Sequence, residues 1–301
     1  MRPAAFLALL AATAAALGAA QPLGAQAPVR RLAVARDASV RILNLTGSIR
    51  VTGWDRDSVT ISGAPPRGGG TLLAGGSERG VKIVVEADPS VDVPGTALEI
   101  RVPRTATLWV KSASAAITIE NVAGEVEASS VTGTITIRGA PAVLVAESME
   151  GDIDISAPAR VSRVKTAGGD ITVREAAGEV SATSVSGAIR LLDARGITSG
   201  RVESVSGGVT FNGGVAAGGS LDLQTHDAPI EIFLPATQGA VVDVAAYGGK
   251  TMNRIPGLVG KPTRGKAMQY VLGNGGARVT ARSLKGDVSL RSRMPRPNPS
   301  P

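Results

Sequence analysis

The sequence contains no cysteine, a single histidine and few aromatic residues, which make up 2% of the chain. The absence of cysteine excludes disulfides, thiolate catalysis and cysteine-ligated zinc. The scarcity of aromatic side chains argues against a core of large rings and against platforms that stack on sugars. No helical periodicity is evident after residue 20. Stability is therefore expected to come from buried aliphatic side chains and from backbone pairing.

The first twenty residues have the composition of a secretory signal peptide. Arg2 supplies a positive charge, residues 4–17 are apolar, and the small residues of "GAA" follow at 18–20. This apolar stretch is short for a bilayer span, which requires about 20 residues, so an uncleaved anchor is the less favoured alternative. No later segment is apolar enough to span a membrane. We expect cleavage before Gln21 and an exported protein in the periplasm, on the cell surface or in the medium.

The net charge of +7 is distributed unevenly. Residues 243–301 contain eleven lysine or arginine residues and two acidic residues, a net charge of +9. Residues 21–242 contain twenty basic and twenty-three acidic residues, a net charge of −3. The basic character is therefore a property of the C-terminal fifth of the chain.

A short phrase recurs at a fixed step in the middle of the sequence. "SSVTGTITI" at residues 129–137 is followed by "ESMEGDIDI", "KTAGGDITV" and "TSVSGAIRL", each 18 residues after the last. The glycines that anchor these copies are Gly133, Gly151, Gly169 and Gly187, and the same place is taken by Ala115, Gly207 and Ala228 in less regular copies and by Gly47 and Gly286 in weaker ones. Self-similarity at a fixed period indicates stacked structural units.

Each repeat contains two short strands. Apolar residues occur two and four places after the anchor, as in Ile153 and Ile155, with polar residues between them. Such alternation is typical of a half-buried strand. A second strand precedes the anchor and carries a column of small apolar residues: Val110, Ala128, Ala146, Val164, Ala182 and Val202. A serine or threonine follows two places after each of these residues.

The pattern predicts an all-β fold, a parallel β-solenoid with coils of about 18 residues, in which like residues stack at about 4.8 Å. An antiparallel meander with hairpin turns is the alternative, but it would not require the same side-chain size at each column. We divide the chain into a signal peptide (1–20), an N-terminal β segment that caps the solenoid (21–104), regular repeats (105–238), a basic excursion with a final coil (239–293) and a Pro-rich tail (294–301).

These motifs resemble a bacterial family known as the "putative adhesin" domain, an exported β-strand-repeat domain of unknown function. The features that carry the resemblance are "GSIRVTGWDRDSVTISG", "LEIRVPRTATLWVKSASAAITI", the S-x-[ST]-G-x-I-x-I copies and "GNGGARVTARSLKGDVSLRSR". The resemblance covers roughly residues 30–293. It implies a β-helical fold and a non-catalytic role at the cell envelope or surface, and it brings no catalytic residues.

Two groups of polar residues are candidates for chemistry. Asp152, Asp154 and Asp170 are expected to face outward, as solvated turn residues, as a weak cation site or, least favoured, as an acid/base pair. The serine and threonine column shares the inward parity of the small apolar column, so we expect a buried hydroxyl ladder rather than nucleophiles. The single histidine, His226, is expected to be an exposed turn residue. No catalytic, metal-binding or cofactor-binding residue is assigned, and no cofactor is expected.

The leading hypothesis is a non-enzymatic exported protein, an adhesin or a binding or structural module of the envelope. An end-to-end polymerising β-helical scaffold and, less favoured, a polysaccharide-active β-helix enzyme remain alternatives. The partner expected from the charge is an anionic envelope polymer or polysaccharide; nucleic acid is not expected, because an exported protein seldom meets it. The candidate contact residues are Lys250, Arg254, Lys261, Arg264, Lys266, Arg278, Arg282 and Lys285. A solvated segment that only aids solubility is the simpler interpretation. The pattern indicates no oligomeric state.

Overall fold

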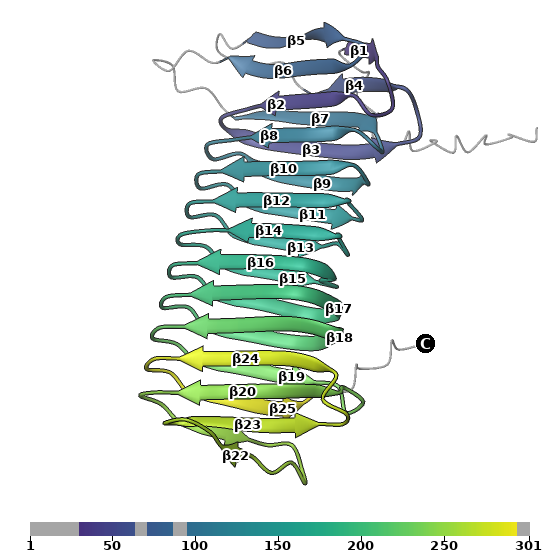
Figure 1. The fold of residues 1–301 in the computed structure, drawn as a ribbon. Coiled ribbons are helices and arrows are strands. Elements are labelled where there is room, and N and C mark those ends of the chain that lie inside the picture. Colours follow the sequence, from purple (N-terminus) through teal and green to yellow (C-terminus); the bar gives the residue numbers. More distant parts are fainter. Residues whose placement is uncertain (1–29, 64–70, 87–94, 294–301) are drawn as a thin grey trace, which may run out of the picture.

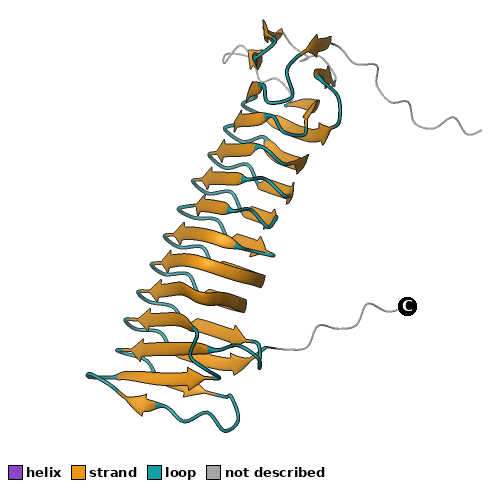
Figure 2. Ribbon diagram, turned by 45° about the vertical axis from the view of Figure 1, so that its right-hand side comes forward, coloured by secondary structure: helices purple, strands orange, loops and turns teal. Residues whose placement is uncertain are grey.

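The computed structural model describes residues 30–63, 71–86 and 95–293, so the predicted signal peptide and the Pro-rich tail lie outside the described residues. Within these ranges the secondary structure consists of strands and turns, and no helix is formed. The strands stack along one long axis into a rod (Figures 1 and 2). The described residues contain no helix that could cross a bilayer. The all-β prediction is confirmed.

The described residues contain twenty-five strands. The N-terminal strands are β1 (Arg30–Ala33), β2 (Ser39–Leu43), β3 (Gly47–Trp54), β4 (Ser58–Ser62), β5 (Thr71–Ser77), β6 (Gly80–Glu86) and β7 (Thr96–Pro103). The central strands are β8 (Thr107–Lys111), β9 (Ala116–Val122), β10 (Glu125–Ser130), β11 (Ile135–Gly139), β12 (Val143–Ser148), β13 (Ile153–Ser156), β14 (Val161–Lys165), β15 (Ile171–Arg174), β16 (Gly178–Ser184), β17 (Ile189–Ser204) and β18 (Val209–Thr225). The C-terminal strands are β19 (Ile230–Leu234), β20 (Ala240–Ala246), β21 (Thr251–Asn253), β22 (Lys261–Pro262), β23 (Ala267–Leu272), β24 (Ala277–Ser283) and β25 (Val288–Ser292).

The central strands form two facing walls of parallel strands. Wall A contains β8, β10, β12, β14, β16 and the last parts of β17 and β18, whereas wall B contains β9, β11, β13, β15 and the first parts of β17 and β18. The register follows the repeat, since Ala128 pairs with Ala146 and Ala146 with Val164. The solenoid arrangement of these coils is thus confirmed, and the antiparallel meander is wrong for them.

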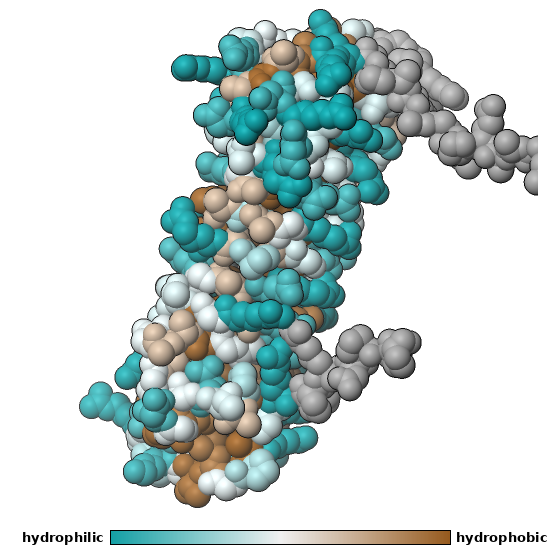
Figure 3. All heavy atoms as spheres, turned by 90° about the vertical axis from the view of Figure 1, so that its right-hand side faces the viewer, coloured by the Kyte–Doolittle hydropathy of each residue, from teal (hydrophilic) through white to brown (hydrophobic). Residues whose placement is uncertain are grey.

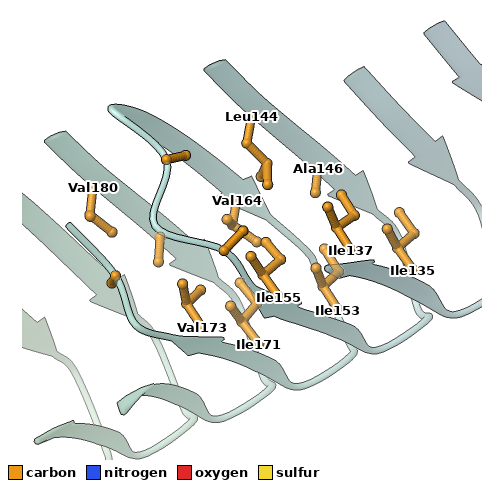
Figure 4. Close-up of a cluster of buried hydrophobic side chains, with 14 of the residues drawn as sticks. Ile135, Ile137, Leu144, Ala146, Ile153, Ile155, Val164, Ile171, Val173 and Val180 are labelled. Atoms are coloured by element: carbon orange, nitrogen blue, oxygen red, sulfur yellow. The ribbon is translucent and has the colours of Figure 1, made fainter. Parts of the chain in front are cut away.

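The columns recognised in the sequence line the interior between the walls. Ile135, Ile153 and Ile171 stack in one column of wall B, at most 1% exposed, and the small apolar column of wall A packs opposite (Figure 4). Full burial of each aliphatic side chain contributes about 1.5–3 kcal/mol. Because successive coils pair in parallel and share this core, each coil is stabilised mainly by its neighbours.

The anchor glycines are required by the close approach of stacked turns. A Cβ atom built on Gly151 would lie 2.2 Å from the carbonyl oxygen of Gly133, and one on Gly169 would lie 2.3 Å from that of Gly151. Real Cβ atoms essentially never come within 3.0 Å of another heavy atom in this way. The anchor therefore repeats as glycine because the backbone of each coil rests directly on the backbone of the coil before it.

At the N-terminal end the layers do not follow the order of the sequence. The coil formed by β2 and β3 pairs on one side with β8 and β9, in agreement with the repeat. On its other side it pairs with β6 and β7, which come later in the chain. The antiparallel strands β5, β4 and β1 complete this end. The first coil of the sequence is therefore an inner layer of the rod.

The C-terminal end has the same kind of exchange. β24 lies between β18 and β20 in wall A, and β25 lies between β19 and β21 in wall B. The chain thus leaves a layer open after β19, builds the end of the rod with β20 to β23, and returns to fill the open layer (Figure 1). The final coil anticipated from "SLKGDVSL" is formed, but it lies one layer inside the end.

Two of the outermost strands are poorly suited to pairing with another chain. β22 has only two residues, Lys261 and Pro262, and pairs antiparallel with β23. Proline and lysine at a short edge strand disfavour the addition of a further strand. At the other end, β1 begins with Arg30 and Arg31 and pairs antiparallel with β4. The C-terminal end therefore resembles a cap rather than a surface for end-to-end stacking, whereas at the N-terminal end the seven-residue strand β5 pairs only with β6 among the described residues.

Candidate binding surfaces

The serine and threonine column is a structural ladder. Ser148 Oγ accepts a hydrogen bond of 2.9 Å from the N–H of Gly151 and donates one of 3.5 Å to the carbonyl oxygen of Val131 in the preceding coil. Ser130 and Thr166 repeat this arrangement. The hydroxyls thus satisfy turn amides and carbonyls in a buried place, as expected. This geometry confirms the hydroxyl ladder.

The outward aspartates also connect one coil to the next, beyond the solvated role expected of them. Asp152 Oδ1 accepts a hydrogen bond of 2.8 Å from the N–H of Asp170, and Asp170 Oδ1 accepts one of 2.8 Å from the N–H of Ala188. Asp170 Oδ2 also accepts a 2.8 Å hydrogen bond from Arg190. The hydrogen bond from Arg190, followed by that from Ala188, lowers the pKa of Asp170 despite partial burial. The carboxylate of Asp170 is therefore held ionised by donors from the following coil.

The groove beside these aspartates is open and of mixed charge. It has a volume of about 380 Å³ and is lined by Asp152, Asp154 and Asp170 together with Thr136, Thr172 and Arg190. Arg174 adds an ion pair of 2.8 Å to Asp154 on the same wall. Within the described part of the chain, no group of three or more histidine, aspartate or glutamate side chains is arranged to hold a metal ion. The groove therefore offers neither a cation cage nor a pair of free carboxylates.

His226 is exposed, as expected, and its side chain contacts that of the next residue. Adjacent strand residues would point to opposite faces, whereas His226 and Asp227 lie in a turn and their side chains contact each other through Nδ1 and Oδ1. Lys285 lies 2.9 Å from the same carboxylate. The hydrogen bond from Lys285, and then that from His226, lowers the pKa of Asp227. Among the described residues, the imidazole of His226 forms no hydrogen bond with a serine hydroxyl that it could deprotonate.

The eight predicted contact residues fall into two groups in the structure. Three of them, two on β24 and one in the turn that follows it, form ion pairs: Arg278 with Asp243 at 2.9 Å, Arg282 with Asp222 at 3.7 Å, and Lys285 with Asp227 at 2.9 Å. A pair of this exposed kind is worth about 1 kcal/mol or less, but it offsets most of the local positive charge. These three residues are therefore weaker candidates for contacts with an anionic ligand.

The other five, which we term the basic cap, gather at the C-terminal end. They are Lys250, Arg254, Lys261, Arg264 and Lys266. All five are exposed, and none forms an ion pair with another described residue. Lys266 donates a hydrogen bond to the carbonyl oxygen of Tyr247, which leaves its charge unneutralised. On the face that Figure 3 shows, hydrophobic surface gathers at the same end, and Val259 there is 81% exposed.

A second cationic cluster, missed in the sequence, lies near the N-terminal end of wall A. Arg41 on β2, Lys82 on β6 and Lys111 on β8 surround a small pocket beside Trp109. These residues are scattered over 71 positions of the sequence (41–111). The repeat places β2 beside β8, and the exchange of layers adds Lys82 from β6. The repeat could have indicated that residues 41 and 109 are neighbours, because they occupy the same column of adjacent copies.

A ridge of exposed apolar residues follows one set of turns. It runs two places before each anchor, along the left edge of Figure 1. The large side chains in it are Leu45, Val131, Met149, Val185, Val205, Leu284 and Tyr247, between 44% and 58% exposed. The turn backbones beneath them are joined by hydrogen bonds from coil to coil, as between Met149 and Val131. The ridge is only one side chain wide. A stable interface buries roughly 800 Å² per partner, which requires a broader surface.

The chain is similar to solved structures and to a protein-family model. The chain is similar over 88% of its length to 98% of a putative cell adhesion protein from Clostridium sporogenes, with 9% identity and a TM-score of 0.21. It is similar over 87% of its length to 95% of a putative adhesin from Bacteroides fragilis, with 12% identity and a TM-score of 0.37. No curated protein matches the sequence. The model of the family described as Toastrack DUF4097 matches residues 32–253, more than half of the chain, and the protein therefore belongs to this family.

Proposed function

We propose that the protein is a non-enzymatic, exported binding module of adhesin type, which attaches to an anionic polymer of the cell envelope through the basic cap. The single observation that carries this proposal is the contrast between paired and unpaired cations. Arg278, Arg282 and Lys285 each meet a carboxylate, whereas the five cations of the basic cap meet none among the described residues.

The position of the basic cap supports attachment by this end. The cap closes the rod, so a polymer could lie against it without contact with the walls. Residues 244–286 contain no acidic residue. Asp287 accepts a hydrogen bond from the backbone N–H of Lys250, so the positive charge is reduced there, but the side chains of the basic cap form no ion pair among the described residues. Unpaired surface cations raise the local concentration of an anionic partner and accelerate its association. The partner that fits is a polymer with closely spaced phosphate or carboxylate groups.

The alternatives receive less support. Polymerisation end to end would require an open edge at both ends, whereas the C-terminal end closes with a two-residue strand that contains proline. A polysaccharide-active enzyme would require an acid and a base directed into one site. The aspartates of wall B instead accept hydrogen bonds from neighbouring coils and from arginine.

The proposal is tested with two variants that lose the same charge. In one, Lys261, Arg264 and Lys266 become glutamine; in the other, the paired Arg278, Arg282 and Lys285 become glutamine. Both are loaded on immobilised heparin at low salt and eluted with increasing sodium chloride. Screening shortens the Debye length from about 10 Å at 0.1 M to about 3 Å at 1 M salt, so attachment by spread charge should be lost within this range.

We expect the variant of the basic cap to elute at clearly lower salt than the variant of the paired cations. Equal elution of the two variants would show that only net charge matters, and the basic cap would then have no special role. Retention of all proteins at 1 M salt would contradict an electrostatic attachment. Thermal unfolding of both variants controls for loss of structure.

A further inference from the structure

We propose that the pocket between Arg41, Lys82, Lys111 and Trp109 binds a soluble anionic amphiphile, a molecule in which a phosphate or carboxylate is bonded to a small apolar or ring group. This pocket lies on β6, β2 and β8, near the opposite end of the rod from the basic cap (Figure 1). It is independent of the attachment proposed above.

The parallel register places the four side chains in two short rows on the outward face of wall A. Lys82, Arg41 and Trp109 are cross-strand neighbours in the first row. Val84, Leu43 and Lys111 are neighbours in the second row. Adjacent strands are about 4.8 Å apart, so each row spans about 10 Å. An apolar floor of valine and leucine is thus bordered by cations on three strands.

The cations of this pocket lack the carboxylate partners that most cations of the walls have. None of Arg41, Lys82 and Lys111 forms an ion pair among the described residues, although Arg163, Arg174 and Arg190 all do so on later coils. The nearest acidic residue in the row is Glu127, which is beside Trp109 on the side away from Arg41. Three positive charges converge here over apolar surface, a combination that favours an anion with an apolar body.

Trp109 gives the pocket an apolar contact surface in addition to its positive charge. It is 38% exposed, and the guanidinium of Arg41 lies 4.8 Å from the centre of its ring. This cation–π contact orients both side chains and keeps the guanidinium at the edge of the pocket. Leu43 is similarly exposed at 36%. These apolar groups have no cover in the described structure, and a ligand that covers them gains free energy from their burial.

The size of the pocket limits the apolar part of the ligand. Its volume is about 120 Å³. An apolar cavity of about 150 Å³ in another protein accommodates benzene, so this smaller pocket can hold a short alkyl group or part of a single ring. A polymer backbone of linked rings would extend beyond it. The geometry therefore favours a compact ligand, or the terminal group of a longer one.

The experiment uses three small probes that separate charge from apolar contact. Phenyl phosphate, inorganic phosphate and phenol are titrated into the purified chain, and binding is measured by ligand-observed NMR. We expect phenyl phosphate to bind at least about five-fold more tightly than either fragment, and Lys111→Gln to weaken it about five-fold through loss of one charge near the anion. Trp109→Leu should weaken phenyl phosphate but leave inorganic phosphate unchanged.

Two matched controls make the result specific. Lys165→Gln removes an exposed lysine from the same column of wall A, beside Glu147, and should leave the affinity unchanged. The triple variant of Lys261, Arg264 and Lys266 should also retain it, which separates this pocket from the basic cap. Lys82→Gln replaces Lys111→Gln if the latter lowers the melting temperature. Equal affinity for phenyl phosphate and inorganic phosphate, equal losses in Lys111→Gln and Lys165→Gln, or absence of saturable binding would each overturn the proposal.

Discussion

The central coils and the two ends of this molecule bury the same kinds of side chain, but they differ in the order in which the chain supplies the layers. From β8 to β18 each coil lies on the coil that precedes it in the sequence. At each end, one coil is inserted between two others out of sequence order. At the N-terminal end this coil is formed by β2 and β3, and β2 lies between β6 and β8. At the C-terminal end it is formed by β24 and β25, and β24 lies between β18 and β20.

This difference in layer order shows how a repeat protein can close its ends. A strictly sequential solenoid leaves an unpaired strand at each end, which invites association with other chains. Here the inserted coil at each end pairs with the central array on one side and with the terminal strands on the other. It therefore connects the terminal strands to the array. The same exchange creates the pocket beside Trp109 from three separate segments. The ends therefore carry both the closure of the fold and the candidate binding surfaces.

The largest effect is expected from removal of the inserted layer. In a chain that ends at Gly276, β20 loses β24 and retains only the antiparallel partner β23. We expect residues 240–272 to lose protection in hydrogen–deuterium exchange, because a two-stranded hairpin alone is marginal at best. The central coils should keep theirs.

The matched control for this truncation is a longer, internal deletion. Joining Gly239 to Ala277 removes residues 240–276 but leaves β24 beside β18 and β25 beside β19, as in a sequential coil. This variant should remain folded although it lacks more residues. If the truncated chain keeps its hairpin protected, or if the internal deletion unfolds the central coils, the inserted layer is not what joins the cap to the array.

A large local effect is expected from charge in the central core. Ile153 is 1% exposed, so Ile153→Asp should lower the free energy of unfolding by more than about 4 kcal/mol through lost burial and an unpaired charge. Asp154→Ser removes one exposed ion pair with Arg174 and should cost less than about 1 kcal/mol. Urea denaturation measures both. Similar losses for the two substitutions would contradict the facing of β13.

A smaller effect is expected from the anchor glycines. Gly169→Ala would place a Cβ atom 2.3 Å from the carbonyl oxygen of Gly151 and force the stacked turns apart, at a cost of about 2–3 kcal/mol. Its neighbour Gly168 has no heavy atom within 3.6 Å of the same position, so Gly168→Ala should change stability by less than about 0.5 kcal/mol. Thermal unfolding of the pair gives the comparison, and a larger loss in Gly168→Ala would refute the stacking argument.

The regular part of the fold could be predicted from the sequence because its signal is periodic. Ile153, Ile155 and the small residues opposite them recur at one step, and the parallel register follows that step. The exchange of layers at the ends could not be predicted in this way. "SLKGDVSL" has the pattern of a coil, but a coil pattern does not specify which neighbour it pairs with, since every coil offers nearly the same edge.

The candidate surfaces were predictable to different degrees. The charge run at 250–285 identified the basic cap, but the ion pairs of Arg278, Arg282 and Lys285 depend on acids on other strands and carry no local signal. In the cluster around Trp109, the repeat spacing relates Arg41 to Trp109, but Lys82 comes from the non-sequential neighbour β6, which no spacing in the sequence indicates. The hydroxyl ladder was predictable because parity alone directs those side chains inward.

The smallest effect is expected from the outward aspartates of the central coils, and it depends on pH. The hydrogen bond from Arg190 lowers the pKa of Asp170 in the folded chain, so this carboxylate stabilises the fold above its unfolded pKa of about 3.9 and loses that contribution as the pH falls through the folded value. Because both partners are nearly half exposed, the contribution should be less than about 1 kcal/mol. Asp170→Asn should therefore lower the free energy of unfolding slightly at pH 7 and not at pH values below the folded pKa, where the wild-type carboxyl is also neutral. Arg190→Gln should raise the pKa of Asp170 toward its ordinary value in an NMR titration of the carboxyl carbon. An unchanged titration in Arg190→Gln would mean that the backbone amide of Ala188, rather than the arginine of the next coil, holds this carboxylate ionised.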